Sequence, residues 1–375
     1  MRDRRTVWVE GFVLEHTPTG VGRYLGNVLQ VWAARNWWPN AQKILLIHRG
    51  LTEPWTHLTA AYPVMRLAFP RASFLLWQQL RVRAWLRRQP PGIYLAPNYT
   101  VPLAVPHCRL VILHDLAMWH HPEWFPRRKR RILQWAIRRS VEEAARILVP
   151  SATVAEEVTT ALRIPSDRIV ITYEGWDPRL IRPPRWSRET LCTRFGLPED
   201  RPMWLTVGAI FQRRQPELVL DAWVHMARQR TDPPTLVWIG ANRTTPRIDV
   251  RRIIRTRGLE STVHFLGYQP EPVVHAFYHA CDGVLYLSAY EGFGLPVLEA
   301  LVLGKPVIVS DIPVFREIYG NAVYRIPLDV AALVDALRAG ISPPPTHVVH
   351  SLRTRFTWER TARTIADTIY SLAEP

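Results

Sequence analysis

The sequence predicts two α/β domains, each built around a doubly wound parallel sheet. Short apolar runs alternate with helical patterns through the first half of the chain, and a second alternation follows a proline-rich interruption. The length of 375 residues is long for one hydrophobic core and suits two domains of ordinary size. A hydrophobic content of 47% permits two full cores.

The first half of the chain carries the elements of one such domain. The apolar runs expected to form strands are residues 7–9, 44–47, 93–96, 110–113, 147–149 and 169–172. Helical patterns follow at about residues 21–35, 74–88, 128–145 and 152–162. Because strands that alternate with helices pair in parallel, these elements predict one sheet covered by helices.

A proline-rich segment separates this domain from the next. Residues 177–186 contain Pro178, Pro183 and Pro184, which interrupt any regular element. We place the interdomain linker here. The predicted first domain is therefore residues 1–180, and the predicted second domain is residues 181–355.

The second alternation has the same character as the first. Its expected strands are residues 203–207, 236–239, 263–266, 284–287, 307–309 and 323–326. A helix is expected over residues 217–228, and a loop at residues 342–345 is expected to precede a last helix at about residues 357–372. Since open parallel sheets bind ligands beyond the carboxyl ends of their strands, we expect the site in a cleft between the two domains.

The chain is strongly basic, with a net charge of +16 and an isoelectric point near 10.4. Basic residues gather at 81–88 and 127–139, and the second segment mixes cations with Ile132, Trp135 and Ile137 at helical spacing. Such a segment suits an anionic membrane surface, a phosphate-bearing acceptor or an ordinary solvated helix face. Nucleic acid is a weaker interpretation, because the chain has no zinc-finger spacing, ribonucleoprotein motif or basic tail.

Cysteine spacing and hydropathy give no sign of a disulfide, a metal centre or a spanning helix. Cys108, Cys192 and Cys281 are scattered and odd in number, so we expect reduced thiols. Arg, Pro or His interrupts every apolar run before it reaches about eighteen residues. The first residues are typical of a core strand and not of a secretory signal. We therefore expect a cytoplasmic protein.

The most informative stretch is residues 288–311, which read as a strand end, a glycine loop, a short helix and another strand. Gly292 and Gly294 let the backbone approach a ligand closely, and Pro296 suits the first turn of a helix. Backbone N–H groups and the positive end of that helix favour an anionic group, and we expect phosphate.

Two carboxylates frame this loop. Glu291 enters it, and Glu299 lies eight positions further on the helix, within reach of a hydroxyl-rich part of the same ligand. Sugar nucleotides carry both phosphate and hydroxyl groups. The loop therefore predicts a sugar-nucleotide site.

This pattern resembles the donor-binding motif of retaining glycosyltransferases of family 4, in which two Glu residues separated by seven others flank a Gly-Phe-Gly-Leu-Pro core. The resemblance spans nearly the whole chain and includes features of mannosyltransferases. It implies the two-domain type B (GT-B) fold of glycosyltransferases, whose last helix, here within residues 356–375, crosses back to the first domain.

The resemblance also implies roles for the residues of the motif. The backbone amides of Phe293, Gly294 and Leu295 would bind the donor diphosphate. Glu299 would hold the ribose hydroxyls. Glu291 would act at the donor sugar near its anomeric carbon, and the sequence leaves open whether it is a nucleophile or a stabiliser of the transition state.

Two motifs of the first domain extend the resemblance. Gly20 and Gly22 match the family's N-domain glycine loop, which implies an approach to the donor diphosphate or the acceptor. His114 ends a buried strand, and the resemblance implies that it orients the donor sugar. His120 and His121 form no metal-binding spacing with it, and we expect neither a metal nor another cofactor.

The second domain carries further matches. Arg213 and Arg214 stand after Gly208, where the family has an Arg and a Lys that neutralise the donor diphosphate. Arg in the Lys position keeps the charge but not the geometry of a point-charge Lys. Gly267 and Tyr268 match the stretch whose backbone reads the nucleotide base, so the sequence does not distinguish guanosine from uridine or adenosine donors.

A turn at Glu174, Gly175 and Asp177 also matches the family, and we expect it to be structural. Together these features predict a metal-independent, retaining enzyme that moves a hexose, mannose being one candidate, from a nucleoside diphosphate sugar to a hydroxyl of a lipid-linked or polysaccharide precursor. Two alternatives stay open at this point. One is another two-domain sugar-nucleotide enzyme, such as an epimerase or a phosphorylase. The other is a non-catalytic, basic, surface-binding protein with a degenerate site.

Overall fold

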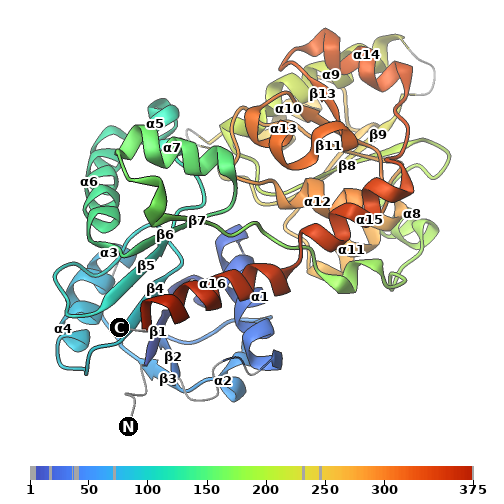
Figure 1. Cartoon of the computed structure of the whole chain (residues 1–375). Coiled ribbons are helices and arrows are strands. Elements are labelled where there is room, and N and C mark those ends of the chain that lie inside the picture. The colour runs from blue at the N-terminus through green and yellow to red at the C-terminus, as the bar shows by residue number, and fades with distance from the viewer. Residues whose placement is uncertain are drawn as a thin grey trace. The chain divides into compact units, whose positions relative to one another are not determined.

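The computed structural model describes residues 6–373 except 17–18, 36, 38–41, 71–72, 230–232 and 245–246. The chain divides into two compact units, Met1–Gly175 with Phe356–Pro375, and Trp176–Arg355. Each unit contains one parallel sheet with helices packed on it (Figure 1). The predicted fold class is therefore confirmed.

The first unit is built on a seven-stranded sheet in the order β3-β2-β1-β4-β5-β6-β7. All neighbouring strands pair in parallel. The strands are β1 (Val7–Glu10), β2 (Lys43–Ile47), β3 (Val64–Arg66), β4 (Ile93–Ala96), β5 (Cys108–Ile112), β6 (Arg146–Val149) and β7 (Ile169–Ile171). Every predicted run forms a strand, whereas β3 was not predicted.

Helices cover this sheet, with α4 and α6 on one side of it and α1 and α16 on the other (Figure 1). The predicted helix at 74–88 is a composite, because a π-helical segment, η2, lies between α3 and α4 and the helix ends at Leu86. The helices are α1 (Gly20–Arg35), α2 (Leu58–Ala61), α3 (Phe74–Leu76), η2 (Trp77–Val82), α4 (Arg83–Leu86), α5 (Ala117–His120), α6 (Arg127–Glu143), α7 (Ala152–Leu162) and α16 (Trp358–Ala373).

The last helix, α16, belongs to the first unit, as the resemblance implied. It packs along α1, where Trp32 Nε1 donates a hydrogen bond to Ala362 O at 2.9 Å. Arg35 and Glu359 form an ion pair of 2.8 Å at the surface of the same contact. Trp32 is buried, so α16 supplies part of the core of a unit that begins more than three hundred residues earlier in the chain.

One carboxylate lies fully buried in the first unit. Glu10 ends β1, and its Oε2 accepts hydrogen bonds from Gln78 Nε2 and Tyr94 OH, both at 2.6 Å. Its Oε1 has no partner among the described residues. Burial raises the pKa of Glu10 to about 8, and these two hydrogen bonds only partly oppose that rise.

The second unit is built on a six-stranded sheet in the order β10-β9-β8-β11-β12-β13, again with parallel pairing throughout. Its strands correspond to the six predicted runs. They are β8 (Met203–Val207), β9 (Thr235–Ile239), β10 (Val263–Gly267), β11 (Gly283–Tyr286), β12 (Val307–Ser310) and β13 (Tyr324–Ile326).

The helices of the second unit include one that corrects a prediction. The loop at residues 342–345 does not lead into the last helix of the chain, because α15 intervenes and ends at Arg355. The helices are α8 (Arg188–Phe195), α9 (Pro216–Gln229), α10 (Val250–Thr256), α11 (Glu271–Ala280), α12 (Leu295–Val302), α13 (Pro313–Tyr319), α14 (Val330–Ala339) and α15 (Thr346–Arg355).

Each sheet has a point at which the strand order reverses. In the first unit the reversal lies between β1 and β4, and in the second it lies between β8 and β11. Loops that leave the carboxyl ends of such strand pairs diverge and leave a crevice for a ligand. The segments that carry Arg213, Arg214 and Glu291 follow β8 and β11, so they lie at the reversal of the second sheet.

Candidate active site

Three charged side chains converge at the reversal point of the second sheet. The Glu291 carboxylate lies 3.2 Å from Arg214 Nη2 and 3.6 Å from Arg213 Nε. Its Oε1 also accepts a hydrogen bond of 2.9 Å from Ser288 Oγ. The Glu291 and Arg214 side chains are only 8% and 10% exposed, so the charges interact largely out of contact with water. The structure thus brings together three residues that the sequence singled out in separate motifs.

Arg214 packs against Tyr286, the last residue of β11. Its guanidinium lies 3.8 Å from the centre of the Tyr286 ring and donates a hydrogen bond to the Tyr286 hydroxyl. Burial raises the pKa of Tyr286, so this hydroxyl stays neutral at physiological pH. Arg214 Nε and Nη1 are buried and have no hydrogen-bond partner among the described residues. Two N–H donors on a buried cation, without a protein acceptor, indicate a site for an anion.

The glycine loop is fixed next to these arginines. Ala289 N donates a hydrogen bond of 2.8 Å to Arg213 O, which ties the loop after β11 to the turn after β8. Gly294 has a φ of +95°, and a Cβ placed there would lie 2.7 Å from the Phe315 ring, so no other residue fits. Tyr319 OH donates to Gly294 O at 2.9 Å and holds the loop from behind.

The helix α12 begins directly after this loop without a side-chain cap. Its N-cap residue is Gly294, which has no side chain to accept from the first turn. The N-terminal N–H groups of a helix carry a partial positive charge and bind anions. The predicted amides at Phe293, Gly294 and Leu295 therefore lie on a loop and helix start that are suited to a phosphate group, and their binding role stays a prediction.

Glu299 lies on α12 and is only 2% exposed. Its Oε2 accepts a hydrogen bond of 2.8 Å from Tyr278 OH on α11. This bond orients the carboxylate, and the predicted contact with ribose hydroxyls stays a prediction. Gly267 and Tyr268, the predicted base-binding residues, lie at the end of β10 on the edge of the sheet, where Tyr268 is exposed.

The glycine loop of the first unit begins helix α1. Gly22 N donates to Thr19 Oγ1 at 3.3 Å, so a side chain caps this helix. A Cβ at Gly22 would lie 3.0 Å from Val13 O, which gives this glycine a packing role. Gly20 is exposed, and nothing within the described residues would contact a Cβ there. Of the two, Gly20 is the one open to a ligand.

His114 follows β5 and is fixed by its neighbours. Its Nε2 lies 2.9 Å from the Pro97 carbonyl, which can only accept, so Nε2 carries a proton. The ring also meets Tyr24 edge to face, with 5.2 Å between the ring centres. Next to it, Tyr99 adopts a φ of +64°, an unfavourable backbone conformation for an aromatic residue that is often found at functional sites.

The structure adds a contact of Glu174 that the sequence did not reveal. We expected its turn to be structural, yet its carboxylate lies 3.9 Å from His114 Nδ1, and both side chains are only 10% exposed. No hydrogen bond reaches the Glu174 carboxylate from any described residue. A ligand hydroxyl placed between this carboxylate and His114 Nδ1 could form a hydrogen bond with each. The sequence signal that could have indicated a functional position was the location of Glu174 just beyond the carboxyl end of β7.

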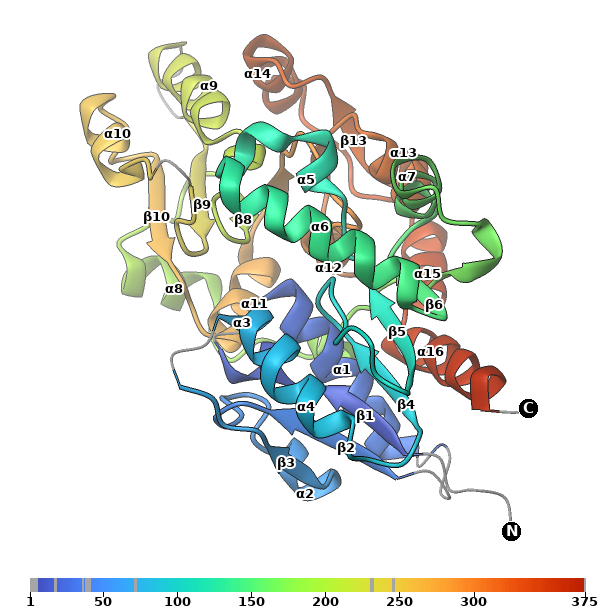
Figure 2. The same ribbon diagram turned by 90° about the vertical axis from the view of Figure 1, so that its left-hand side faces the viewer.

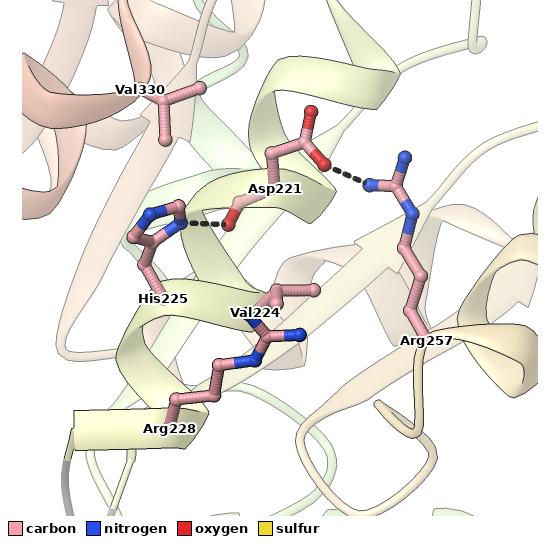
Figure 3. A pocket seen from close by; sticks show the side chains of 6 residues that line it. All are labelled: Asp221, Val224, His225, Arg228, Arg257 and Val330. Atoms are coloured by element: carbon pink, nitrogen blue, oxygen red, sulfur yellow. Dashed lines mark hydrogen bonds and ion pairs between the residues drawn. The ribbon is translucent and has the colours of Figure 1, made fainter.

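A hollow of about 450 Å³ lies elsewhere, beside α9 of the second unit (Figure 3). It is lined by Asp221, Val224, His225, Arg228, Arg257 and Val330. Arg228 and Arg257 are the two arginines that line the hollow. Arg257 Nη1 donates a hydrogen bond to Asp221 Oδ1 at 2.5 Å, so the charge of Arg257 is already paired. None of the predicted site residues lines this hollow. Within the described ranges, no three His, Cys, Asp or Glu side chains gather as a metal site would require.

Two family models match the chain and divide it near the predicted boundary. The model "Glycosyltransferase Family 4" matches residues 18–180, and the model "Glycosyl transferases group 1" matches residues 187–347. Between them they cover most of the sequence. Every predicted site residue lies inside one of these two matches.

Similar sequences and structures agree with these models. The O-antigen chain mannosyltransferase B of Escherichia coli is 28% identical over 340 residues, which cover 85% of this chain and 86% of that protein. The O-antigen chain mannosyltransferase RfbU of Salmonella typhimurium is 24% identical over 242 residues, which cover 64% of this chain and 62% of that protein.

The structure of Anabaena Alr3699/HepE in complex with UDP and glucose superposes with a TM-score of 0.76 at 16% identity, covering 98% of this chain and 100% of that chain. WaaG, a glycosyltransferase involved in lipopolysaccharide biosynthesis, has a TM-score of 0.69 at 18% identity, covering 98% and 97%.

Proposed function

The chain belongs to the family 4, group 1 glycosyltransferases, and we propose that it transfers a hexose from a nucleoside diphosphate sugar to a hydroxyl of a lipid-linked or polysaccharide precursor. The similarity to O-antigen mannosyltransferases makes mannose the first sugar to test. We further propose that the reaction retains the configuration at the anomeric carbon and requires no metal, because Arg213 and Arg214 supply the positive charge.

The observation that carries this proposal is the cluster of Glu291, Arg213 and Arg214. Arg214 uses Nη2 on Glu291 and Tyr286, and its buried Nε and Nη1 still lack an acceptor. A diphosphate oxygen can therefore bind Arg214 without displacing Glu291. Negative charge grows on the diphosphate as the glycosidic bond breaks, so fixed donors stabilise the transition state more than the bound substrate.

In this scheme Glu291 stays next to the cations that hold the leaving group. It is thereby placed near the carbon to which that leaving group is attached. It stabilises the positive charge that develops on the sugar ring, or attacks the anomeric carbon directly. The N–H groups at the start of α12 complete the phosphate site, and Glu299 binds the ribose.

We assign Glu174 and His114 to a sugar hydroxyl. With Nε2 donating to Pro97, only Nδ1 of His114 faces Glu174, and the 3.9 Å gap between them is too long for a direct hydrogen bond. A hydroxyl placed between them can donate to one and is oriented by the other. This gives the first unit a part in substrate choice and not only in folding.

The membrane forms the last part of the proposal. No helix in the described residues is long and apolar enough to cross a bilayer. We propose that the enzyme works at the inner face of a membrane, where a lipid-linked acceptor is anchored, through the basic segments 81–88 and 127–139.

The first experiment is a thermal-shift panel of GDP, UDP, ADP and their hexose conjugates, without added metal. A ligand that binds the native state raises the melting temperature, so one nucleotide should stabilise wild type selectively. That shift should be lost in Arg214→Ala and kept in Arg316→Ala, a surface control. Release of free nucleoside diphosphate only when acceptor is present would support transfer. Conversion of the donor into an epimeric sugar nucleotide without release would favour an epimerase, and release that requires inorganic phosphate would favour a phosphorylase. No shift with any nucleotide would contradict the proposal.

A further inference from the structure

Two basic helical segments lie side by side on one face of the first unit. Figure 2 shows α4 and α6 in front of the strands. The loop between β4 and β5 joins them at two points. The carbonyl oxygen of Val101 accepts a hydrogen bond from Gln79 Nε2 at 2.7 Å, and its backbone N–H donates one to Ser140 Oγ on α6 at 3.0 Å. Ala104 accepts from Arg87 Nε at 3.1 Å and donates to Glu143 Oε2 at 2.9 Å. The outward faces of η2, α4 and α6 are therefore held as one surface.

Large apolar side chains stand out from this surface. Leu76 and Leu80 are 51% and 53% exposed, and Ile132 and Trp135 on α6 are 58% and 60% exposed. They include the most exposed large hydrophobic side chains among the described residues. Their helical neighbours Trp77, Val82 and Ile137 are buried in the core, so the exposed set is not needed to hold the helices on the sheet. We call these four residues the apolar ridge.

Cations without partners surround the apolar ridge. The exposed residues Arg127, Arg128, Lys129, Arg131 and Arg138 form no ion pair with any described residue. Segments 73–90 and 127–141 contain no Asp or Glu at all. Some exposed arginines elsewhere have carboxylate partners, as in the pairs Arg316–Asp311 at 2.7 Å and Arg363–Asp367 at 3.1 Å, and others, such as Arg252 and Arg338, have none among the described residues. This surface is set apart by two adjacent helical segments that carry no acidic residue among their cations.

We propose that this surface docks on a bilayer of anionic phospholipids, with the apolar ridge entering the interfacial region and the arginines on the headgroups. On α6, Trp135 lies within the exposed stripe, with Arg131 and Arg138 one turn away on either side and Arg128 two turns away. A basic helix face that carries Trp and aliphatic side chains at its centre lies in the plane of a membrane interface. Nucleic acid would use the cations but gives no role to Leu76, Leu80 and Ile132.

This inference deepens the proposed function, on which it rests only for the presence of a lipid-linked acceptor. It names the side chains that contact lipid and adds an apolar contribution to the charge attraction. Docking by two contributions has a distinct signature. Salt should weaken the attraction of the arginines, while the apolar ridge should keep part of the binding once contact is made.

The test is co-sedimentation of the full chain with vesicles of phosphatidylcholine containing about 30% phosphatidylglycerol, compared with pure phosphatidylcholine. We expect strong binding to the anionic vesicles only. Ile132→Ser with Trp135→Ser should lower the bound fraction about tenfold, and so should Arg128→Ser with Arg131→Ser and Arg138→Ser. Leu328→Ser and Arg360→Ser, at exposed positions outside this surface, are the matched controls and should bind as wild type.

The outcomes separate this inference from the proposed function. Glu291→Ala should lose transfer and keep vesicle binding, so the two can fail independently. Equal binding of the double serine variant and wild type would overturn the role of the apolar ridge. Retention of single-stranded RNA without retention on anionic vesicles would overturn the membrane docking and identify nucleic acid as the partner. Because all substituted side chains are exposed, we expect the variants to keep the melting temperature of wild type. An unchanged melting temperature would exclude misfolding as the cause of weaker vesicle binding.

Discussion

The two units share one architecture but differ in what they present at the carboxyl ends of their strands. In the second unit, Glu291 pairs with Arg213 and Arg214 and leaves a net positive charge, and Tyr286 and Ser288 hold the cluster in place. In the first unit, His114 has one fixed bond and the Glu174 carboxylate has no hydrogen bond from any described residue. The second unit therefore holds its charges in place before a ligand arrives, whereas in the proposed function a ligand hydroxyl would supply the hydrogen bonds that the first unit lacks.

Changing Glu291 should have the largest effect and tests the preorganised side of this comparison. We expect Glu291→Ala to lower kcat about 10³-fold or more, because a charge that acts at the transition state is lost. The protein should stay folded but melt at a lower temperature, because Arg214, whose side chain is only 10% exposed, loses its carboxylate partner. Steady-state kinetics with thermal melts measure both. Wild-type kcat in this variant would end the assignment of the site.

Arg214 distinguishes charge from geometry within the same cluster. Arg214→Ala should lower kcat about 10²-fold to 10³-fold, because the departing diphosphate loses a buried donor. Arg214→Lys should recover part of that loss, since the charge is restored while the stacking on Tyr286 and the fork of N–H donors are not. Equal activity of the Lys and Ala variants would show that the geometry of the guanidinium, and not its charge, matters.

Glu174 tests the first unit in the opposite sense. We expect Glu174→Gln to raise KM for the sugar substrate about tenfold, the loss of one charge-assisted hydrogen bond of about 1.4 kcal/mol. The same change should leave the melting temperature unchanged, because the carboxylate accepts no hydrogen bond from a described residue. Kinetics and calorimetry on one preparation give both values. A loss of stability together with unchanged KM would return Glu174 to the structural role that the sequence suggested.

Glu10 should give the smallest effect on catalysis, and it concerns stability alone. Its folded pKa of about 8 lies above its ordinary value of 4.5, so the folded state binds a proton that the unfolded state releases. Its contribution to stability is therefore complete below about pH 4.5 and is lost as pH rises to about 8. Glu10→Gln should match wild type near pH 5 and be more stable above pH 8, by up to a few kcal/mol. Melting curves at both pH values, with activity as a control, decide the point. Parallel pH dependence in both proteins would contradict it.

The sequence predicted the sheets well because buried parallel strands leave continuous apolar runs. It did not predict β3, which has three residues and lies at the sheet edge, where Met65 and Arg66 are exposed and leave no such run. The helix α15 was missed because its residues Thr346–Arg355 are mostly polar and follow three prolines. Both are elements whose position depends on packing against neighbours and not on their own pattern.

The candidate site was predictable where a motif is local in sequence. Glu291 and Glu299 lie within one loop and helix, and their spacing alone indicated a site. Arg214 contacts Tyr286, which lies 72 positions further along the chain. Glu174 approaches His114, which lies 60 positions before it. Only the arrangement of the strands reveals such pairs. The same holds for the apolar ridge, since exposure of Ile132 and Trp135 is decided by which face of α6 the sheet covers.

The placement of α16 has a consequence for the order in which the protein matures on the ribosome. The first unit includes Phe356–Pro375, so its core around Trp32 stays open while the whole second unit is being translated. Domains usually fold as they emerge, beginning with the N-terminal one. Here the second unit can reach its native state first, and synthesis of α16 closes the unit that was begun before it. A ribosome that stalls before codon 356 therefore leaves a chain in which the apolar surface of α1 around Trp32 is not covered by α16, and such a surface is a natural substrate for chaperones.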